Sequence, residues 1–180
     1  MRDELLNLIK ELAYKKGEFT LSSGKASKHY VNCKPVTLSG IGLKLCSLMM
    51  LEHVEEDSKA VAGLTLGADP VVSGVAMASV DQPWAPNLDA LIVRKEPKGH
   101  GTASQIEGPV LPKGSKVTVL EDVVTTGGSS VKAVKVLRDA GYEVDTIITI
   151  VNRKEYDRWL WYDKSINLVP LFTIEDICQE

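Results

Sequence analysis

The chain has 180 residues, of which 44% are hydrophobic and 25% charged, and we expect a soluble globular protein with a single core. Its formal net charge of −3 disfavours a nucleic-acid binder that relies on a basic surface. No apolar run approaches the roughly 20 residues that span a bilayer, and the N-terminus lacks the apolar core of a signal peptide, so we expect a cytoplasmic location. The cysteines are far apart and form no CxxC pair, which indicates reduced thiols rather than a zinc site or disulfides.

The N-terminal part of the chain is predicted to hold two helices on either side of a hairpin. Apolar residues at helical spacing predict a helix from Asp3 to Lys16, which Gly17 would end. Short alternating pieces broken by small polar residues follow, so residues 17–34 are predicted to form a strand–loop–strand hairpin. A second helix is predicted from about Gly40 to Glu56.

Strands and helices alternate over the rest of the chain. Asp69 and Pro70 predict a helix start, because aspartate caps free amides and proline suits the first helical position; this helix would run through Met77. Another helix is predicted from about Ser130 to Gly141. Buried strands are predicted at residues 59–64, 88–93, 116–120, 146–151 and 168–172. The alternation predicts an α/β fold whose parallel sheet is covered by helices on both faces.

Residues 95–115 form a long segment rich in glycine and proline between two predicted strands. A loop of this length inside a compact domain is usually functional or disordered. Its start is locally basic, because Arg94, Lys95, Lys98 and His100 lie within seven residues. One interpretation is a surface excursion without function. The other, which the charge favours, is a mobile loop that closes over a polyanion.

The stretch VTVLEDVVTTGGSS joins a strand, an acid pair, a run of small residues and a helix start. Ligands of α/β sheets bind beyond the carboxyl ends of the strands, where we expect Glu121 and Asp122. The small residues from Thr125 to Ser129 and the amides of the next helix suit a phosphate. The two carboxylates suit the vicinal hydroxyls of a sugar, directly or through Mg²⁺. The combination predicts a site for ribose 5-phosphate, although turn chemistry alone also produces such small-residue runs.

The string VLEDVVTTGGS resembles the phosphoribosyl-diphosphate (PRPP) signature of type I phosphoribosyltransferases. Three further stretches, FTLSSGKAS, VRKEPKGHG and VNRKE, are similar in order and spacing to the orotate phosphoribosyltransferase family, so the resemblance covers essentially the whole chain. It implies a single domain over residues 1–180, with a central parallel sheet flanked by helices. It also implies a small N-terminal hood at about 1–40 and a mobile active-site loop at about 95–115.

The resemblance implies a reaction as well. Pentosyltransferases of this family transfer ribose 5-phosphate from PRPP to N1 of orotate, which gives orotidine 5′-monophosphate and pyrophosphate in pyrimidine biosynthesis. The implied assembly is a homodimer whose active-site loop is shared between subunits, with neither a nucleic acid nor a membrane as partner. Mg²⁺ is the implied cofactor, held mainly by PRPP and pyrophosphate rather than by a metal site of the protein.

The functional positions of the family carry over to residues of this chain. Asp122, beside the reacting ribose, and Lys98, in the loop, are the implied catalytic residues. Orotate is expected to contact Lys25, Thr125 and Arg153, and the alternative for Arg153 is a solvated arginine at a strand end. PRPP is expected to bind Arg94, Lys95, Lys98, His100, Glu121, Asp122, Val123, Val124, Thr125, Thr126, Gly127, Gly128 and Ser129.

The chain departs from the family pattern at two places. Ala26 stands where many relatives carry a second basic residue after SGK. Ala68 and Asp69 stand in the loop after the first sheet strand, where some relatives have a lysine. Both departures concern a contact that the resemblance implies on the pyrophosphate side.

Two other functions are compatible with parts of the pattern. One is a phosphoribosyltransferase for another base, a purine or uracil, and the other is a non-catalytic regulator that senses PRPP. Arg153 and the FTLSSGK hairpin favour an anionic pyrimidine over a neutral base. The acidic chain shows no helix-turn-helix pattern and leaves little room for the DNA-binding module of a regulator.

Overall fold

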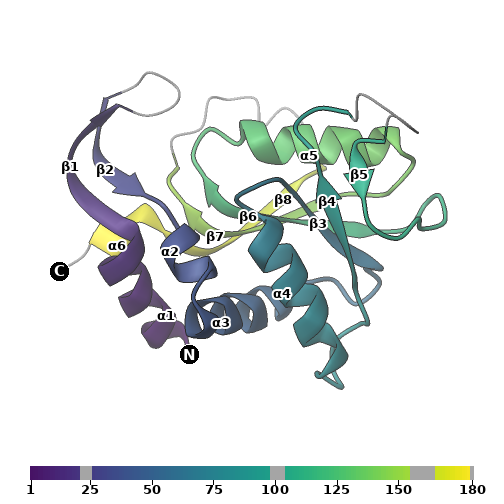
Figure 1. Cartoon of the computed structure of the whole chain (residues 1–180), viewed down its shortest axis with the longest axis horizontal. Coiled ribbons are helices and arrows are strands. Elements are labelled where there is room, and N and C mark those ends of the chain that lie inside the picture. Colours follow the sequence, from purple (N-terminus) through teal and green to yellow (C-terminus); the bar gives the residue numbers. More distant parts are fainter. Residues whose placement is uncertain (21–25, 98–103, 155–164, 179–180) are drawn as a thin grey trace.

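The computed structural model describes residues 1–20, 26–97, 104–154 and 165–178 (Figure 1). No helix within these ranges combines the length and the apolar character that a membrane span requires. The helical segments are α1 Arg2–Leu8, the π-helical η1 Ile9–Ala13, α2 Lys34–Thr37, α3 Gly40–Leu51, α4 Asp69–Val80, α5 Gly128–Asp139 and α6 Ile174–Cys178. The strands are β1 Tyr14–Thr20, β2 Ala26–Val31, β3 Ala60–Leu64, β4 Asp89–Val93, β5 Ile106–Glu107, β6 Val117–Val124, β7 Thr146–Asn152 and β8 Asn167–Thr173.

Six strands form one sheet in the order β5-β4-β3-β6-β7-β8, and all neighbours are parallel except β4 and β5. Every residue of β3 and β7 is buried, because helices cover both faces of the sheet. Figure 1 shows α5 on one face and α3 and α4 on the other. Leu120 and Ile148 belong to the apolar core of the α3–α4 face, and Val119 and Ile147 to that of the α5 face. The predicted α/β fold with a covered parallel sheet is confirmed.

β1 and β2 form a separate antiparallel hairpin. Tyr14 pairs with Val31 at its base, and Thr20 pairs with Ala26 towards its tip. The prediction of a hairpin in this region is confirmed for the described strands. In Figure 1 the hairpin stands on the same side of the molecule as α6, away from β4 and β5.

The predicted end of the first helix, at Lys16, is wrong. Helical backbone ends at Ala13, and the chain from Tyr14 onward already forms β1. The pairing of residues 14–16 with β2 overrides the helical spacing, because tertiary contacts routinely outweigh local propensity. Gly17 therefore lies inside a strand, where the register with β2 is irregular, instead of ending a helix.

The start of α4 differs in detail from the prediction. Ala68 is the N-cap residue, and Asp69 lies in the first turn with Pro70 beside it. The Asp69 carboxylate does not cap the helix, since Ala68 and not Asp69 is at the N-cap position; its Oδ2 accepts a hydrogen bond from Thr65 Oγ1 at 2.9 Å. The negative charge still lies at the favourable, N-terminal end of the helix dipole.

Several element lengths were also predicted inaccurately. α3 ends at Leu51 rather than at Glu56, and α4 continues to Val80, past the predicted end at Met77. α2, β5 and α6 have no counterpart in the sequence prediction, because segments this short produce no periodic pattern. β5 lies within the segment predicted as a loop, and pairs antiparallel with the end of β4.

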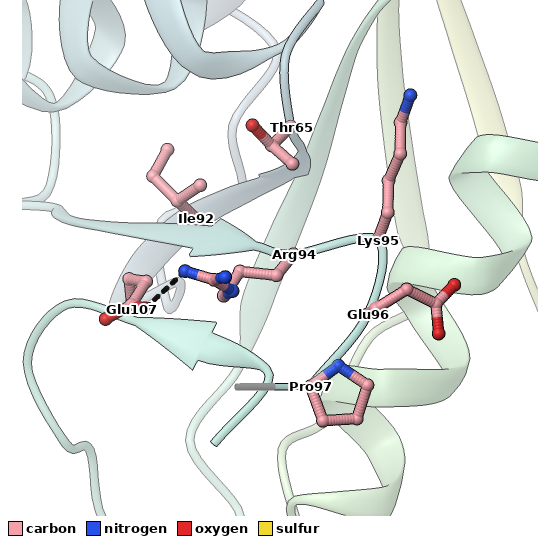
Figure 2. Close-up of a pocket in the computed structure, with 7 residues that line it drawn as sticks. All are labelled: Thr65, Ile92, Arg94, Lys95, Glu96, Pro97 and Glu107. Atoms are coloured by element: carbon pink, nitrogen blue, oxygen red, sulfur yellow. Dashed lines mark hydrogen bonds and ion pairs between the residues drawn. The ribbon is translucent and has the colours of Figure 1, made fainter. Parts of the chain in front are cut away.

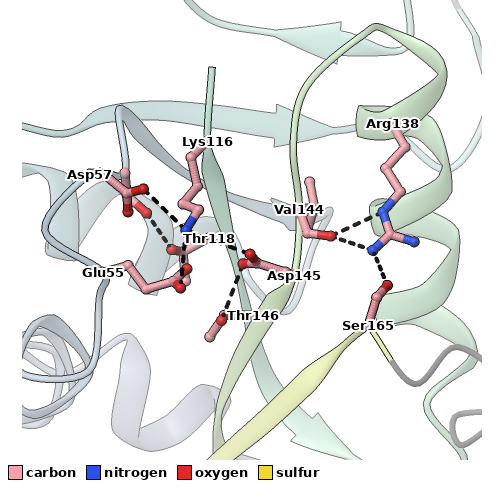
Figure 3. A network of polar contacts seen from close by, with 10 residues as sticks. Glu55, Asp57, Lys116, Thr118, Arg138, Val144, Asp145, Thr146 and Ser165 are labelled. Atoms are coloured by element: carbon pink, nitrogen blue, oxygen red, sulfur yellow. Dashed lines mark hydrogen bonds and ion pairs between the residues drawn. The ribbon is translucent and has the colours of Figure 1, made fainter. Parts of the chain in front are cut away.

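The amino ends of the central strands are joined by a charged network (Figure 3). Lys116, which precedes β6, lies 3.3 Å from Glu55, 3.2 Å from Asp57 and 3.6 Å from Asp145. Burial lowers the pKa of Lys116, but the hydrogen bonds that it donates to Asp57 and Glu55 outweigh this and raise the pKa above its ordinary value. This network stabilises the edge of the sheet opposite the candidate site.

Candidate functional site

The carboxyl ends of the parallel strands meet at one edge of the sheet. Those predicted site residues that the structure describes lie at or just beyond these ends. Glu121 and Asp122 lie inside β6, which continues to Val124 instead of ending at Leu120 as predicted. The strand is longer because Val124 still pairs with Asn152 of β7. The acid pair is therefore held by a paired strand rather than by a loop.

Glu121 and Asp122 point to opposite faces of the sheet, as successive strand residues do. Glu121 faces α5: it is 5% exposed, and its Oε2 accepts a hydrogen bond from the buried Ser130 at 3.1 Å. Asp122 faces the other side, where a Cβ atom at Gly67 would lie only 2.8 Å from its Oδ1. The loop after β3 thus comes so close to Asp122 that a side chain at position 67 would have to displace the Asp122 carboxylate.

Burial and the charge of Asp122 change the pKa of two neighbouring groups, Glu121 and Cys33. Burial raises the pKa of Glu121 to about 8, the charge of Asp122 adds to the rise, and the hydrogen bond from Ser130 opposes it. Glu121 is therefore largely protonated near neutral pH, and a protonated carboxyl group can donate a hydrogen bond. Burial, followed by the charge of Asp122, also raises the pKa of Cys33.

The small-residue run predicted to bind phosphate forms the turn between β6 and α5. Gly127 is the N-cap residue of α5 and has φ 83°, in the left-handed region that favours glycine. The helix begins at Gly128 rather than near Ser130, so more of the run lies in its first turn than predicted. The first amides of a helix have no partner inside the helix and lie at the positive end of its dipole, and both properties favour the binding of an anion. Thr125 and Thr126 lead into this turn.

Arg153 follows β7 directly and is 4% exposed, so the alternative of a solvated arginine is wrong. Its backbone amide donates to the carbonyl of Val124 at 2.9 Å, which places it beside the end of β6. Its Nη2 donates to Ser27 Oγ at 3.0 Å and to the carbonyl of His29 at 2.8 Å. Arg153 therefore joins β2 of the hairpin to the carboxyl edge of the sheet.

The start of the basic segment lies at the same edge, beyond β4. Arg94 Nη1 forms an ion pair with Glu107 Oε1 of β5 at 3.3 Å (Figure 2). Lys95 points in another direction from the same turn. An open cavity of about 420 Å³, also lined by Thr65, lies next to these residues. The charge of Arg94 is thus partly balanced within the chain.

Three predicted site residues, Lys25, Lys98 and His100, lie outside the described residues. Sequence reasoning missed the closeness of Gly67 to Asp122, the hydrogen bond from Ser130 to Glu121, and the contacts of Ser27 and His29 with Arg153. Ser130 belongs to the small-residue run and could have been singled out there. The other contacts join segments far apart in the sequence, for which the sequence holds no direct signal.

No family model matches the chain. The chain is, however, 51% identical to the orotate phosphoribosyltransferase of Thermosynechococcus vestitus over 177 residues, which cover 98% of this chain and 93% of that protein. The chain belongs to the orotate phosphoribosyltransferase family. The resemblance of the four sequence stretches is therefore confirmed, and the family membership extends over nearly the full length.

Solved structures of the orotate phosphoribosyltransferase family have the same fold. The Mycobacterium tuberculosis enzyme in complex with Fe(III) dicitrate superposes with a TM-score of 0.80 at 32% identity and covers 99% of both chains. Its complex with PRPP gives a TM-score of 0.76 at 31% identity, again over 99% of both chains. Adenine phosphoribosyltransferase of Leishmania tarentolae, at 16% identity and a TM-score of 0.63, shares the fold alone. The fold is that of the type I phosphoribosyltransferases.

Proposed function

We propose that this chain transfers ribose 5-phosphate from PRPP to N1 of orotate, giving orotidine 5′-monophosphate and pyrophosphate in pyrimidine biosynthesis. The observation that carries the proposal is the meeting of Asp122, the turn before α5 and the buried Arg153 at one sheet edge, in a chain 51% identical to an orotate phosphoribosyltransferase. The family membership also disfavours the two alternatives, a transferase for another base and a PRPP-sensing regulator.

The phosphate of the ribose is proposed to bind in the turn from Thr125 to Ser129. The backbone amides and the hydroxyl side chains of this turn supply hydrogen-bond donors, and no residue of the turn carries a negative charge. Val123 and Val124 complete the segment that leads into this turn. A phosphate there lies beyond the strand that carries Asp122 and Glu121.

The ribose is proposed to lie against Asp122. Glycosyl transfer of this type develops positive charge on the sugar ring, and a fixed carboxylate stabilises that charge without acting as a nucleophile. The protonated Glu121 is suited to donate a hydrogen bond, whereas Asp122 supplies the negative charge. The two acids are therefore proposed to have different roles.

Orotate is proposed to place its carboxylate near Arg153, with Lys25 and Thr125 as further contacts. A guanidinium group can bind a carboxylate through two parallel hydrogen bonds. Because Arg153 is buried, water competes less for this pair than it would at an exposed site. A neutral base lacks the group that would use this positive charge.

The departing pyrophosphate is proposed to meet the basic segment, namely Arg94, Lys95, Lys98 and His100. Within the described ranges, no group of three or more His, Cys, Asp or Glu side chains could hold a metal ion. Mg²⁺ is proposed to be held mainly by oxygens of PRPP and pyrophosphate, with the Asp122 carboxylate at the same sheet edge. When bound, the ion supplies positive charge next to the pyrophosphate.

We further propose a cytoplasmic homodimer in which the loop of one subunit completes the site of the other. Large apolar side chains at the end of α4 and just beyond it support a protein contact: Met77 is 69% exposed, Val80 70% and Trp84 55%. Neighbouring exposed apolar residues commonly mark interfaces.

A base panel tests the proposed function. The protein is mixed with PRPP, Mg²⁺ and one of orotate, uracil, adenine or hypoxanthine, and pyrophosphate release is measured. We expect release with orotate and release at least about a hundredfold slower with the other bases, because a charged group left without its partner is costly. Release of pyrophosphate with a purine or with uracil would favour the other-base alternative. If none of the bases supports release, the non-catalytic regulator is favoured.

A further inference from the structure

Ser27 lies at the centre of a closed set of hydrogen bonds around Arg153. Its Oγ accepts from Arg153 Nη2 at 3.0 Å and from the backbone amide of His29 at 3.2 Å, and donates to the carbonyl of His29 at 3.0 Å. The same carbonyl accepts from Arg153 Nη2 at 2.8 Å. Ser27 and His29 of β2 thus hold the side chain of Arg153, which follows β7.

These contacts fix the orientation of the guanidinium group. Ser27 and the His29 carbonyl use both N–H groups of Nη2, and because guanidinium is planar and rigid, its remaining donors are oriented with them. Arg153 is 4% exposed, so bulk water does little to hold the group in place. We propose that Ser27 is a positioning residue that directs Arg153 towards the carboxylate of the base. This inference rests on the proposed function, in which Arg153 contacts orotate.

The hairpin side of this arrangement has an anchor of its own. His29 Nδ1 lies 2.8 Å from the hydroxyl of Tyr14 and 3.4 Å from Sγ of Cys178 in α6. The rings of Tyr14 and His29 are stacked with their centroids 5.8 Å apart. The His29 carbonyl is therefore held in place by β1 and α6 independently of Arg153, and acts as a preorganised acceptor.

The test compares Ser27→Ala, Ser27→Thr and Ser58→Ala in steady-state kinetics. Ser58 is the matched control: its buried hydroxyl bonds Thr118 Oγ1 at 2.8 Å, in the segment before β3 at the opposite edge of the sheet. For Ser27→Ala we expect KM for orotate to rise about tenfold, because hydrogen bonds to charged groups are among the stronger ones. KM for PRPP and kcat should change less than about twofold. Ser27→Thr retains the hydroxyl and should restore KM for orotate, and Ser58→Ala should leave it unchanged.

An unchanged KM for orotate in Ser27→Ala, or an equal rise in Ser58→Ala, would overturn the positioning role. A crystal structure of Ser27→Ala separates this inference from the proposed function. Ser27→Ala removes one of the two bonds of Arg153 Nη2 and leaves the bond to the His29 carbonyl. We expect the guanidinium to be displaced from its present orientation, because a single bond does not fix its plane; a guanidinium that stays in place contradicts the inference. If the variant shows that displacement but the unmodified protein releases no pyrophosphate with orotate, the positioning role stands and the proposed function fails.

Discussion

Asp122 has a position that depends on the size of its neighbour Gly67. A Cβ at Gly67 would lie 2.8 Å from Asp122 Oδ1 and 3.0 Å from its Cγ. We therefore expect Gly67→Ala to displace the carboxylate and to lower kcat by about one to two orders of magnitude, because small misplacements at a reacting centre are costly. The melting temperature, measured by calorimetry, should change by only a few degrees, roughly the effect of 1 kcal/mol.

A double-mutant cycle shows whether this loss acts through Asp122. If it does, adding Gly67→Ala to Asp122→Ala should cost no further activity. Equal losses in the presence and absence of Asp122 would instead mean that Gly67 matters for another reason, such as access of substrate to the loop after β3.

Glu121 gives a prediction on pH and stability. Its pKa rises from about 4.5 in the unfolded chain to about 8 in the folded protein. Between these values the folded state binds the extra proton, so this contribution to stability is fully present below pH 4.5 and is lost as the pH rises through 8. Relative to Glu121→Gln, the unfolding free energy should fall by up to about 1.4 kcal/mol per pH unit in this window. Urea unfolding at several pH values measures the difference, and a constant difference would contradict the raised pKa.

The site could be predicted from the sequence where its parts are contiguous. The acid pair, the small-residue run and the helix start follow one another in the chain, and the parallel sheet brings them to the edge where ligands bind. The partners across the chain could not be predicted. Ser27 and Arg153 are separated by 126 positions, and only the packing of the hairpin against the sheet brings them together.

The charged network at the start of β6 predicts a loss of stability without a loss of activity. Lys116 contacts three carboxylates at the edge opposite the site. Lys116→Met should lower the unfolding free energy by about 1 kcal/mol, as expected for a partly exposed network, and leave kcat unchanged. The effect should shrink in 1 M salt, where screening acts over about 3 Å.

Lys113→Met is the control for this experiment. Lys113 is exposed, and no ion pair of Lys113 occurs among the described residues. Its replacement should change the unfolding free energy by less than about 0.5 kcal/mol at either salt concentration. Equal effects of the two replacements would mean that the network contributes nothing beyond the loss of a surface charge.

Long elements were predicted well because each carries its own pattern. The continuous apolar runs of β3 and β7 mark strands buried on both faces, and the parallel sheet follows from their alternation with helices. Element ends were predicted poorly, because pairing with distant strands decides them. Tyr14 continues into β1 through its pairing with Val31, and β6 extends to Val124 through its pairing with β7.

The proposed homodimer predicts complementation between two inactive variants. Lys98→Ala lacks the loop lysine and Asp122→Asn lacks the carboxylate. The activity of each variant alone should be lower by orders of magnitude. If the loop acts in the partner's site, a mixed dimer holds one site with both residues intact, so refolded mixtures should recover up to about a quarter of normal activity. No recovery, in mixtures proven to contain mixed dimers, would mean that each subunit supplies its own loop.

The arrangement of the whole site is tested most directly by a crystal structure with orotidine 5′-monophosphate bound. We expect the phosphate at the amides of residues 127–129, the ribose hydroxyls on the side of Asp122, and the base carboxylate within hydrogen-bonding distance of Arg153. A nucleotide bound with its phosphate away from the start of α5, or with its base remote from Arg153, would contradict this arrangement.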